Sequence, residues 1–274
     1  MKKKLSPIQA ELLRLFKEIR DLLEKNKIEY FACGGTLIGA VREKGFIPWD
    51  DDIDLFMTRP NYDKLLKLAR KNNGKIGKFD VACSELDNSL LPFCKIFDKR
   101  YALNDKGVEG DENYLFIDIF PLDAIPEDRN EQEEFFAKIF KMRKLAGVSR
   151  IKYSYLWHIT ENKALFLPKV ILKTYVNLRG PKIYLRKYIE LCKKYNQNYK
   201  RAKFVSSNVW GKGIIENFEK SELEIMTAKF EDTKINIPKG YDRYLTALYG
   251  DYMTPPKKSE RETHDIEIIK QKEK

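Results

Sequence analysis

Apolar residues in the first half of the chain follow two helical patterns. They recur every three to four positions over residues 7–26 and 61–71, which places them on one face of an α-helix. Ser6, Pro7 and Gln9 mark the start of the first helix. Ser6 and Gln9 suit a capping box, and proline is favoured at the first helical position. We therefore predict helices over both ranges.

Short apolar and aromatic segments between these helices predict strands, because strands favour such residues and are brief. Gly34, Gly35 and Thr36 follow the first of them and lead into a short helical pattern over 37–44. The predicted strands cover residues 28–33, 53–57, 79–83, 93–97 and 115–120.

Helical spacing dominates after residue 127. The pattern predicts helices over 130–147, 162–178 and 183–201, with Gly180-Pro181 separating the last two. The predicted fold class is therefore α+β: a mixed β-sheet core flanked by helices, followed by a helical C-terminal elaboration.

Charge divides the chain in a similar way. The 274 residues include 52 Lys and Arg against 41 Asp and Glu, a net charge of +11. Residues 141–203 contain 17 Lys and Arg and two acidic residues, so this segment is +15 and the rest is −4. We predict a sheet-containing core over 1–125, a helical basic region over 126–245, and a C-terminal segment over 246–274 that returns to the core.

The basic segment indicates an anionic partner, which is a nucleic acid, a lipid surface or an acidic polymer. A solvated helical face without a partner is the alternative.

Hydrophobic residues make up 43% of the chain, which excludes wholesale disorder. No run of 18 apolar residues occurs, so we predict no membrane-spanning helix and expect a cytoplasmic location. Four cysteines without a CxxC pair and two histidines make a zinc site or a disulfide framework improbable.

The segment 47–56 carries the most informative cluster, four aspartates in five positions: Asp50, Asp51, Asp52 and Asp54. Such carboxylates repel one another unless a cation offsets the repulsion. In a strand, Asp52 and Asp54 would share one face, about 6–7 Å apart. A solvated turn is the alternative interpretation.

A further acid, Asp118, lies inside the apolar strand pattern 115–120. A carboxylate there is costly to bury without a partner, so we predict that Asp118 completes a cation site with Asp52 and Asp54. The alternative is a buried hydrogen-bonding residue. Gly34-Gly35-Thr36 adds backbone N–H groups that suit a phosphate. Together these features are typical of metal-assisted phosphoryl transfer.

The sequence at this point resembles the LicD family of phosphotransferases, to which fukutin-like proteins are related. Three blocks carry the resemblance, in the order of the family and over nearly the whole chain. They are residues 30–54 (YFACGGTLIGAVREKGFIPWDDDID), 116–123 (FIDIFPLD) and 249–253 (YGDYM) with Pro255 and Pro256. The middle of the chain, 125–245, shows no family motif.

The resemblance implies a nucleotidyltransferase-like fold. It also implies transfer of a phospho-alcohol from a CDP-activated donor to a sugar hydroxyl, with release of CMP. Phosphocholine from CDP-choline is the best-known case. It is added to teichoic acid or lipopolysaccharide, so the acceptor would be an anionic or lipid-linked glycan. We expect Mg²⁺ or Mn²⁺ as cofactor, no specific nucleic acid, and a peripheral position of the basic helices at the inner membrane face.

Several residues receive roles in this hypothesis. Asp52, Asp54 and Asp118 would bind the metal, and Asp51 or Asp118 would accept the hydroxyl proton. Gly34, Gly35 and Thr36 would contact the donor phosphates, with Arg42 and Lys95 as charge partners. Trp49 would form one wall of a choline cage, and Tyr114 and Phe116 are weaker candidates. His264 either approaches the site or lies in an exposed tail.

Two other functions stay open. The acidic triad also fits a nucleotidyltransferase that attacks the α-phosphate of a nucleoside triphosphate. The basic segment, with its aromatic residues, also fits a nucleic-acid-binding module.

Overall fold

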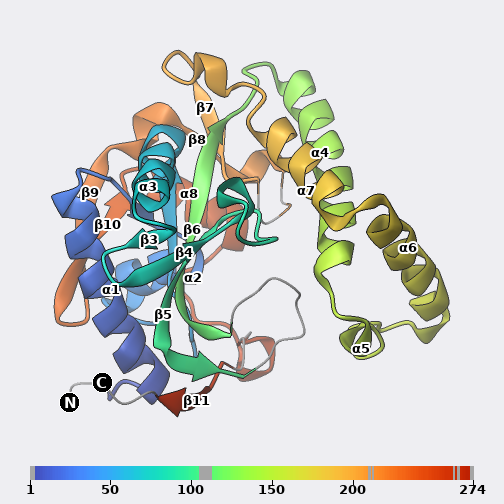
Figure 1. Cartoon of the computed structure of the whole chain (residues 1–274). Coiled ribbons are helices and arrows are strands. Elements are labelled where there is room, and N and C mark those ends of the chain that lie inside the picture. The colour runs from blue at the N-terminus through green and yellow to red at the C-terminus, as the bar shows by residue number, and fades with distance from the viewer. Residues whose placement is uncertain are drawn as a thin grey trace.

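The computed structural model describes residues 4–104, 113–208, 211, 213–261, 263 and 266–271. Figure 1 shows two parts, a sheet with helices packed on it and a group of helices, α4 to α7, to the right of that sheet. Among the described residues, no helix is both long and apolar enough to cross a membrane.

A mixed sheet forms the first part and confirms the predicted α+β class. Its strand order is β1-β2-β6-β5-β4-β3, with β11 paired to β5. The pair β2 and β6 is parallel, and the other neighbours along this path are antiparallel. The strands are β1 (Phe31–Ala32), β2 (Asp54–Thr58), β3 (Lys75–Ile76), β4 (Phe79–Ala82), β5 (Cys94–Leu103), β6 (Tyr114–Ala124) and β11 (Ile268–Gln271).

The first helix, α1 (Pro7–Lys25), begins as predicted, because Ser6 and Gln9 form the capping box. The Gln9 side chain also donates to the carbonyl oxygens of Ile47 and Asp50, at 3.1 and 2.9 Å, and so ties the helix to the acidic segment. Three further helical segments pack around the sheet: α2 (Gly34–Ile38), which continues as a π-helical turn (Gly39–Glu43), α3 (Arg59–Lys71) and α8 (Tyr241–Tyr249).

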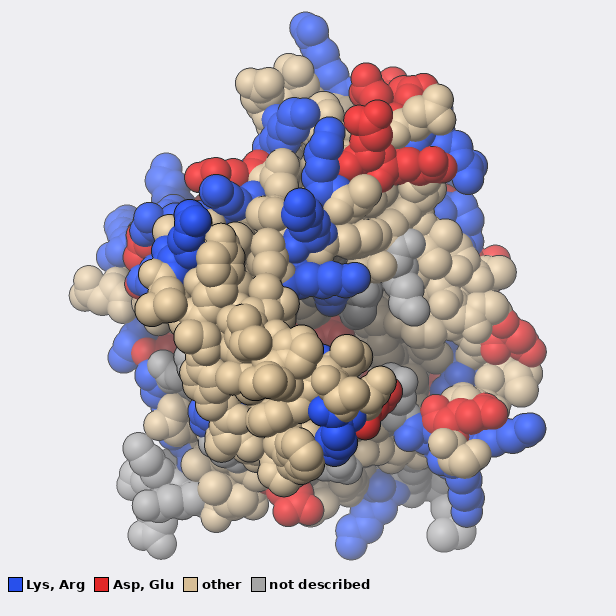
Figure 2. All heavy atoms as spheres, turned by 90° about the vertical axis from the view of Figure 1, so that its right-hand side faces the viewer, with Lys and Arg blue, Asp and Glu red and all other residues tan. Residues whose placement is uncertain are grey.

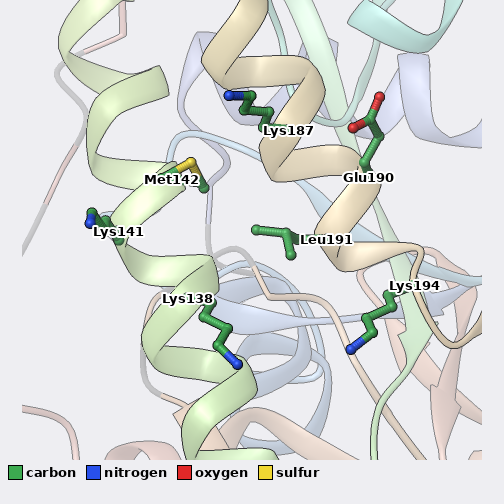
Figure 3. A pocket seen from close by; sticks show the side chains of 7 residues that line it. All are labelled: Lys138, Lys141, Met142, Lys187, Glu190, Leu191 and Lys194. Carbon is green, nitrogen blue, oxygen red and sulfur yellow. The ribbon is translucent and has the colours of Figure 1, made fainter.

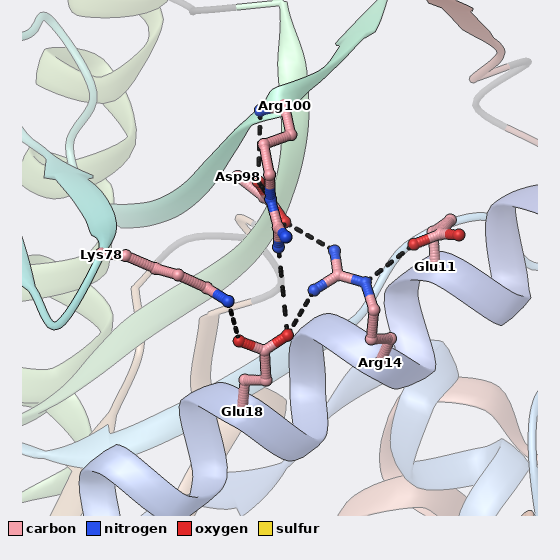
Figure 4. A network of polar contacts seen from close by, with 6 residues as sticks. All are labelled: Glu11, Arg14, Glu18, Lys78, Asp98 and Arg100. Carbon is pink, nitrogen blue, oxygen red and sulfur yellow. Dashed lines mark hydrogen bonds and ion pairs between the residues drawn. The ribbon is translucent and has the colours of Figure 1, made fainter. Parts of the chain in front are cut away.

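A charged network joins α1 to β5 (Figure 4). Arg14 contacts Glu11 and Glu18 on its own helix and Asp98 on β5, at 2.8, 2.6 and 2.6 Å. Arg100 adds two contacts to Asp98, at 2.8 and 2.6 Å. Burial opposes ionisation of Asp98, but hydrogen bonds from Arg100 and Arg14 outweigh it and lower the pKa of this carboxyl.

The second part consists of α4 (Arg129–Arg150), α5 (Tyr153–Leu156), α6 (Phe166–Arg179) and α7 (Pro181–Cys192). Helices α4 and α7 enclose a small apolar cluster of their own, whereas α5 and α6 lie beyond them, away from the sheet (Figure 1). The predicted helix 183–201 ends at Cys192. Beyond it the Asn196 side chain donates to Asp123 at 2.6 Å and accepts from the Ala124 N–H, which fixes a turn against β6.

A buried ion pair lies where this turn meets the sheet. Arg59, at the start of α3, makes two contacts to Asp123 on β6, at 2.6 and 2.9 Å. Both side chains are almost fully buried. Asp123 belongs to the second family block, so its place in that block has a structural explanation that does not involve the acidic segment.

The expected helical character of 126–245 is wrong for residues 204–238. This stretch forms β7 (Phe204–Ser206), β8 (Asn217–Glu219), β9 (Ile225–Phe230) and β10 (Thr233–Pro238). Strands β7 and β8 extend the main sheet from β6, and β9 and β10 form a separate hairpin. These strands escape a search for apolar runs because two have only three residues and β9 is mostly exposed.

Candidate functional site

A cleft of about 990 Å³ lies where the first and third family blocks meet. One wall comes from residues 34–54 and the other from residues 248–261. Six of the residues predicted for the site line this cleft: Gly34, Gly35, Arg42, Trp49, Asp52 and Asp54.

The glycine turn brings backbone into the cleft. Gly34 has φ of +53°, a left-handed conformation that favours glycine. A Cβ on Gly35 would lie 2.8 Å from a carboxylate oxygen of Asp50, so a larger residue at this position would have to displace the Asp50 side chain. Thr36 is buried, and its hydroxyl accepts a hydrogen bond from the Asp54 N–H at 2.9 Å. Thr36 therefore fixes the start of β2 rather than lining the cleft.

The acidic segment contributes a different set of carboxylates from the predicted one. Asp50, Asp52 and Asp54 line the cleft. Asp51 does not, because its carboxylate accepts the Ile266 N–H at 2.9 Å and so anchors the C-terminal segment. Strand β2 begins only at Asp54, so the alternation argument applied to Asp52 and Asp54 does not describe this backbone.

Asp118 lies beside Asp54, because these two residues are register partners in the parallel pair of β2 and β6. Lys95 is the partner of Asp118 on the other side, and its Nζ is 3.1 Å from the carboxylate. The same Nζ lies 3.4 Å from the centre of the Phe116 ring. A row of acid, acid and base therefore crosses three strands, in which Asp54 is half-buried and lines the cleft while Asp118 and Lys95 are buried.

Electrostatic repulsion concentrates on Asp54. Burial raises the pKa of its carboxyl well above the ordinary value, and Asp52, Asp118 and Asp50 raise it further, while Lys95 opposes them. Burial raises the pKa of the Cys33 thiol well above the ordinary value, and Asp54, Asp52 and Asp118 raise it further. Within the described ranges, however, no three Asp, Glu, His or Cys side chains are grouped as a metal site. Asp118 forms an ion pair with Lys95.

Arg42 supplies a cation to the cleft. It donates from Nη1 to the Tyr252 carbonyl oxygen at 2.7 Å and from Nε to Glu43 at 2.9 Å. Its side chain is 8% exposed, and its buried Nη2 has no hydrogen-bond partner in the part of the chain described. A fixed guanidinium with a spare donor is well suited to an anionic ligand.

Trp49 forms an aromatic and cationic part of the cleft with Tyr249 and Tyr252 of the third block and with Arg261, which follows that block. The Arg261 guanidinium lies over the Trp49 ring, 4.0 Å from its centre, and Tyr249 and Tyr252 lie near them on the cleft wall. Sequence reasoning noticed the block at 249–253 but assigned no site residue in it.

The remaining candidates lie elsewhere. Neither Phe116 nor Tyr114 lines the cleft. Phe116 contacts Lys95, and Tyr114 contacts Lys99. His264 falls outside the described residues.

A second hollow of about 420 Å³ lies between α4 and α7 (Figure 3). It shares no lining residue with the cleft. Met142 and Leu191 lie between the helices, and charged side chains surround them: Lys138, Lys141, Lys187, Glu190 and Lys194.

Residues 27–157 match the family described as LicD/FKTN/FKRP, nucleotidyltransferase domain. The chain is 30% identical over 269 residues to the lipopolysaccharide cholinephosphotransferase LicD of Haemophilus influenzae, covering 94% of this chain and 95% of that protein. The chain therefore belongs to the LicD family. A shorter similarity, 36% identity over 93 residues, links it to an uncharacterised protein of Rickettsia typhi, over 32% of this chain and 30% of that one.

Proposed function

We propose that this protein is a phosphotransferase that moves phosphocholine from CDP-choline, or a related group from another CDP-alcohol, onto a hydroxyl of a cell-surface glycan precursor. The acceptor is a lipopolysaccharide or teichoic acid precursor, and CMP is released. One observation carries the proposal: two family blocks distant in sequence form a single cleft that combines carboxylates, a spare arginine donor and an aromatic cation site. The near full-length similarity to a lipopolysaccharide cholinephosphotransferase supports it.

The donor diphosphate would lie against Arg42 and the backbone of Gly34 and Gly35. Arg42 is already held by Glu43 and Tyr252, so little side-chain freedom is lost when Nη2 donates to a phosphate oxygen. Asp52 and Asp54 would hold Mg²⁺ or Mn²⁺ with phosphate oxygens as the other ligands, and the ion would neutralise charge on the diphosphate and on CMP. The raised pKa of Asp54 supports this assignment, since a cation relieves the repulsion that causes it.

Trp49 would receive the quaternary ammonium of choline. Its ring already contacts the cationic guanidinium of Arg261, which supports a cation-binding role for this ring. A choline group on this ring would displace Arg261.

The acceptor proton goes to a carboxylate beside the cleft. Asp118 fits this role better than Asp51. It stands next to Asp54 and is paired with Lys95, whereas Asp51 holds the backbone of Ile266. The acceptor would meet the enzyme at the cytoplasmic face of the membrane.

The test is an assay of CMP release with CDP-choline, CDP-glycerol and CDP-ribitol. Each donor is supplied with a lipopolysaccharide or teichoic acid precursor, with Mg²⁺, with Mn²⁺ and with a chelator. We expect metal-dependent CMP release, highest with CDP-choline, and phosphocholine on the glycan by mass spectrometry. Release of pyrophosphate from a nucleoside triphosphate, without CMP release from any CDP-alcohol, would instead establish the nucleotidyltransferase alternative.

A further inference from the structure

Helix α6 exposes most of its large apolar side chains. Only Lys173 and Val176 are buried among its 14 residues. Leu167, Ile171 and Leu178 are 64%, 61% and 84% exposed. Their spacing of four and seven residues places all three within about 40° of one another around the helix. A stripe of large aliphatic side chains therefore faces water along the length of α6.

The exposure is concentrated in one place. Among the described residues, 16 large hydrophobic side chains are exposed. Ten of them lie within residues 153–183, which we call the α5–α6 surface. Three of the ten are aromatic: Tyr153, Trp157 and Tyr175. Figure 2 views this side of the molecule and shows a broad uncharged area, bordered above by a group of Lys and Arg side chains.

Cations accompany the apolar side chains. Lys163 lies over the Trp157 ring at 4.6 Å, and Arg179 lies over the Tyr175 ring at 5.4 Å. The sequence of this surface holds five Lys and Arg against one acidic residue, Glu161. Aromatic rings with a nearby Lys or Arg are typical of the boundary between lipid headgroups and acyl chains.

This combination excludes two other occupants on physical grounds. A second copy of the chain would bring like charges together around the apolar stripe, which opposes association. A nucleic acid would satisfy the cations but would leave the aliphatic side chains of Leu167, Ile171 and Leu178 without an apolar partner. An anionic bilayer satisfies both, because its headgroups carry the charge and its acyl region accepts the aliphatic side chains.

We propose that the α5–α6 surface docks the protein on an anionic lipid bilayer, with α6 lying in the plane of the headgroups. The inference deepens the proposed function, because a lipid-linked acceptor is presented at such a surface. It rests on separate residues, since none of the α5–α6 surface lines the cleft.

Co-sedimentation with vesicles tests the proposal without any assay of transfer. The full chain is mixed with vesicles of phosphatidylcholine alone or with phosphatidylglycerol added. We expect binding only to the anionic vesicles. The triple variant Leu167→Gln, Ile171→Gln, Leu178→Gln should bind at least about tenfold more weakly, since glutamine keeps the helix but removes the apolar contact. A matched control, Ile225→Gln with Met226→Gln, removes exposed apolar side chains from β9 and should bind normally.

A second variant separates the contribution of charge to vesicle binding from that of apolar contact. Replacing Lys163, Lys169, Arg179 and Lys182 with glutamine should weaken vesicle binding and reduce its dependence on salt. Absence of binding to anionic vesicles by the folded wild-type chain would overturn the proposal, whatever the CMP assay shows. Binding of random oligonucleotides in its place, or a concentration-dependent dimer that the triple glutamine variant abolishes, would identify the other occupants. If the wild-type chain binds anionic vesicles but releases no CMP from any CDP-alcohol, that result would contradict the proposed function alone.

Discussion

Helices α1 and α6 are both amphipathic, yet they use their apolar residues differently. Helix α1 buries seven side chains, six of them aliphatic or aromatic, against the main sheet. Helix α6 buries one aliphatic side chain, Val176, and exposes Leu178 almost completely. Helical periodicity predicts both helices, but it does not tell whether the apolar face packs inside the protein or on an external partner. The structure makes that distinction.

The same contrast separates the two parts of the molecule. Carboxylates line the cleft, whereas the basic segment and most of the exposed large apolar side chains among the described residues belong to the second part. We infer that the first part carries the chemistry and the second carries the attachment. Each of the following experiments tests that division.

Replacing Asp54 with asparagine should have the largest effect. CMP release should fall by at least about a hundredfold, because asparagine would hold the proposed metal ion, which stabilises the reacting phosphates, much more weakly. The melting temperature should not fall, because the substitution relieves repulsion with Asp52 and Asp118. Vesicle binding should be unchanged.

Asp87→Asn is the matched control for this variant. The Asp87 side chain is exposed. Its backbone has φ of +59°, a conformation that asparagine tolerates well. Full activity is expected there. Asp54→Asn with more than about a tenth of the wild-type activity would contradict the assignment of Asp54.

A pair of leucine-to-alanine substitutions compares the two helices directly. Leu15 in α1 is fully buried, so Leu15→Ala should lower the free energy of unfolding by about 2–5 kcal/mol. Leu178 in α6 is 84% exposed, so Leu178→Ala should change it by less than about 0.5 kcal/mol. Urea denaturation gives both values. Equal losses would show that α6 packs on the protein after all.

The charged network between α1 and β5 should make the first part sensitive to acid. The folded-state pKa of Asp98 is lowered, so its contribution is present above the unfolded pKa near 4 and is lost as pH falls through the folded value. Asp98→Asn should lower the free energy of unfolding by about 2 kcal/mol at pH 7. It should also make the free energy of unfolding less dependent on pH between about pH 5 and pH 3. Urea midpoints at each pH measure this.

The control for the network is an exposed ion pair. Asp232 contacts Lys17 at 2.7 Å, but its side chain is 65% exposed. Asp232→Asn should therefore change the free energy of unfolding by less than about 0.5 kcal/mol at pH 7. An equal cost at both positions would contradict the special role of the Asp98 network.

Arg261→Met should have the smallest effect and the most specific one. If choline displaces Arg261 from Trp49, the variant should lower KM for CDP-choline about two- to fivefold and leave KM for CDP-glycerol unchanged. Initial rates with both donors measure this. A raised KM for both donors would show that Arg261 binds the shared CDP group.

Much of the first part could be predicted from the sequence, because local signals and tertiary packing agree there. The capping box of α1 and the apolar strands are examples. The prediction of helix was wrong for residues 193–201 and 204–238. Over residues 193–201 the reason is a contact that is distant in sequence. Asn196 fixes a turn through Asp123 and Ala124, contacts made with a strand more than 70 residues away.

The site was only partly predictable for a related reason. Asp50 and Asp51 are neighbours with the same side chain, and only the fold separates them. Asp50 lies in the cleft, and Asp51 turns to the backbone of Ile266. Arg261 carries no motif of its own, so its contact with Trp49 appears only in the structure.

The two walls of the cleft have a consequence for synthesis of the chain. Residues 34–54 leave the ribosome long before residues 248–261, which follow roughly 200 positions later. The sheet strands from β1 to β6 are complete well before the second wall exists. The cleft therefore lacks one of its two walls until residues 248–261 have been made, even when the strands from β1 to β6 are already present.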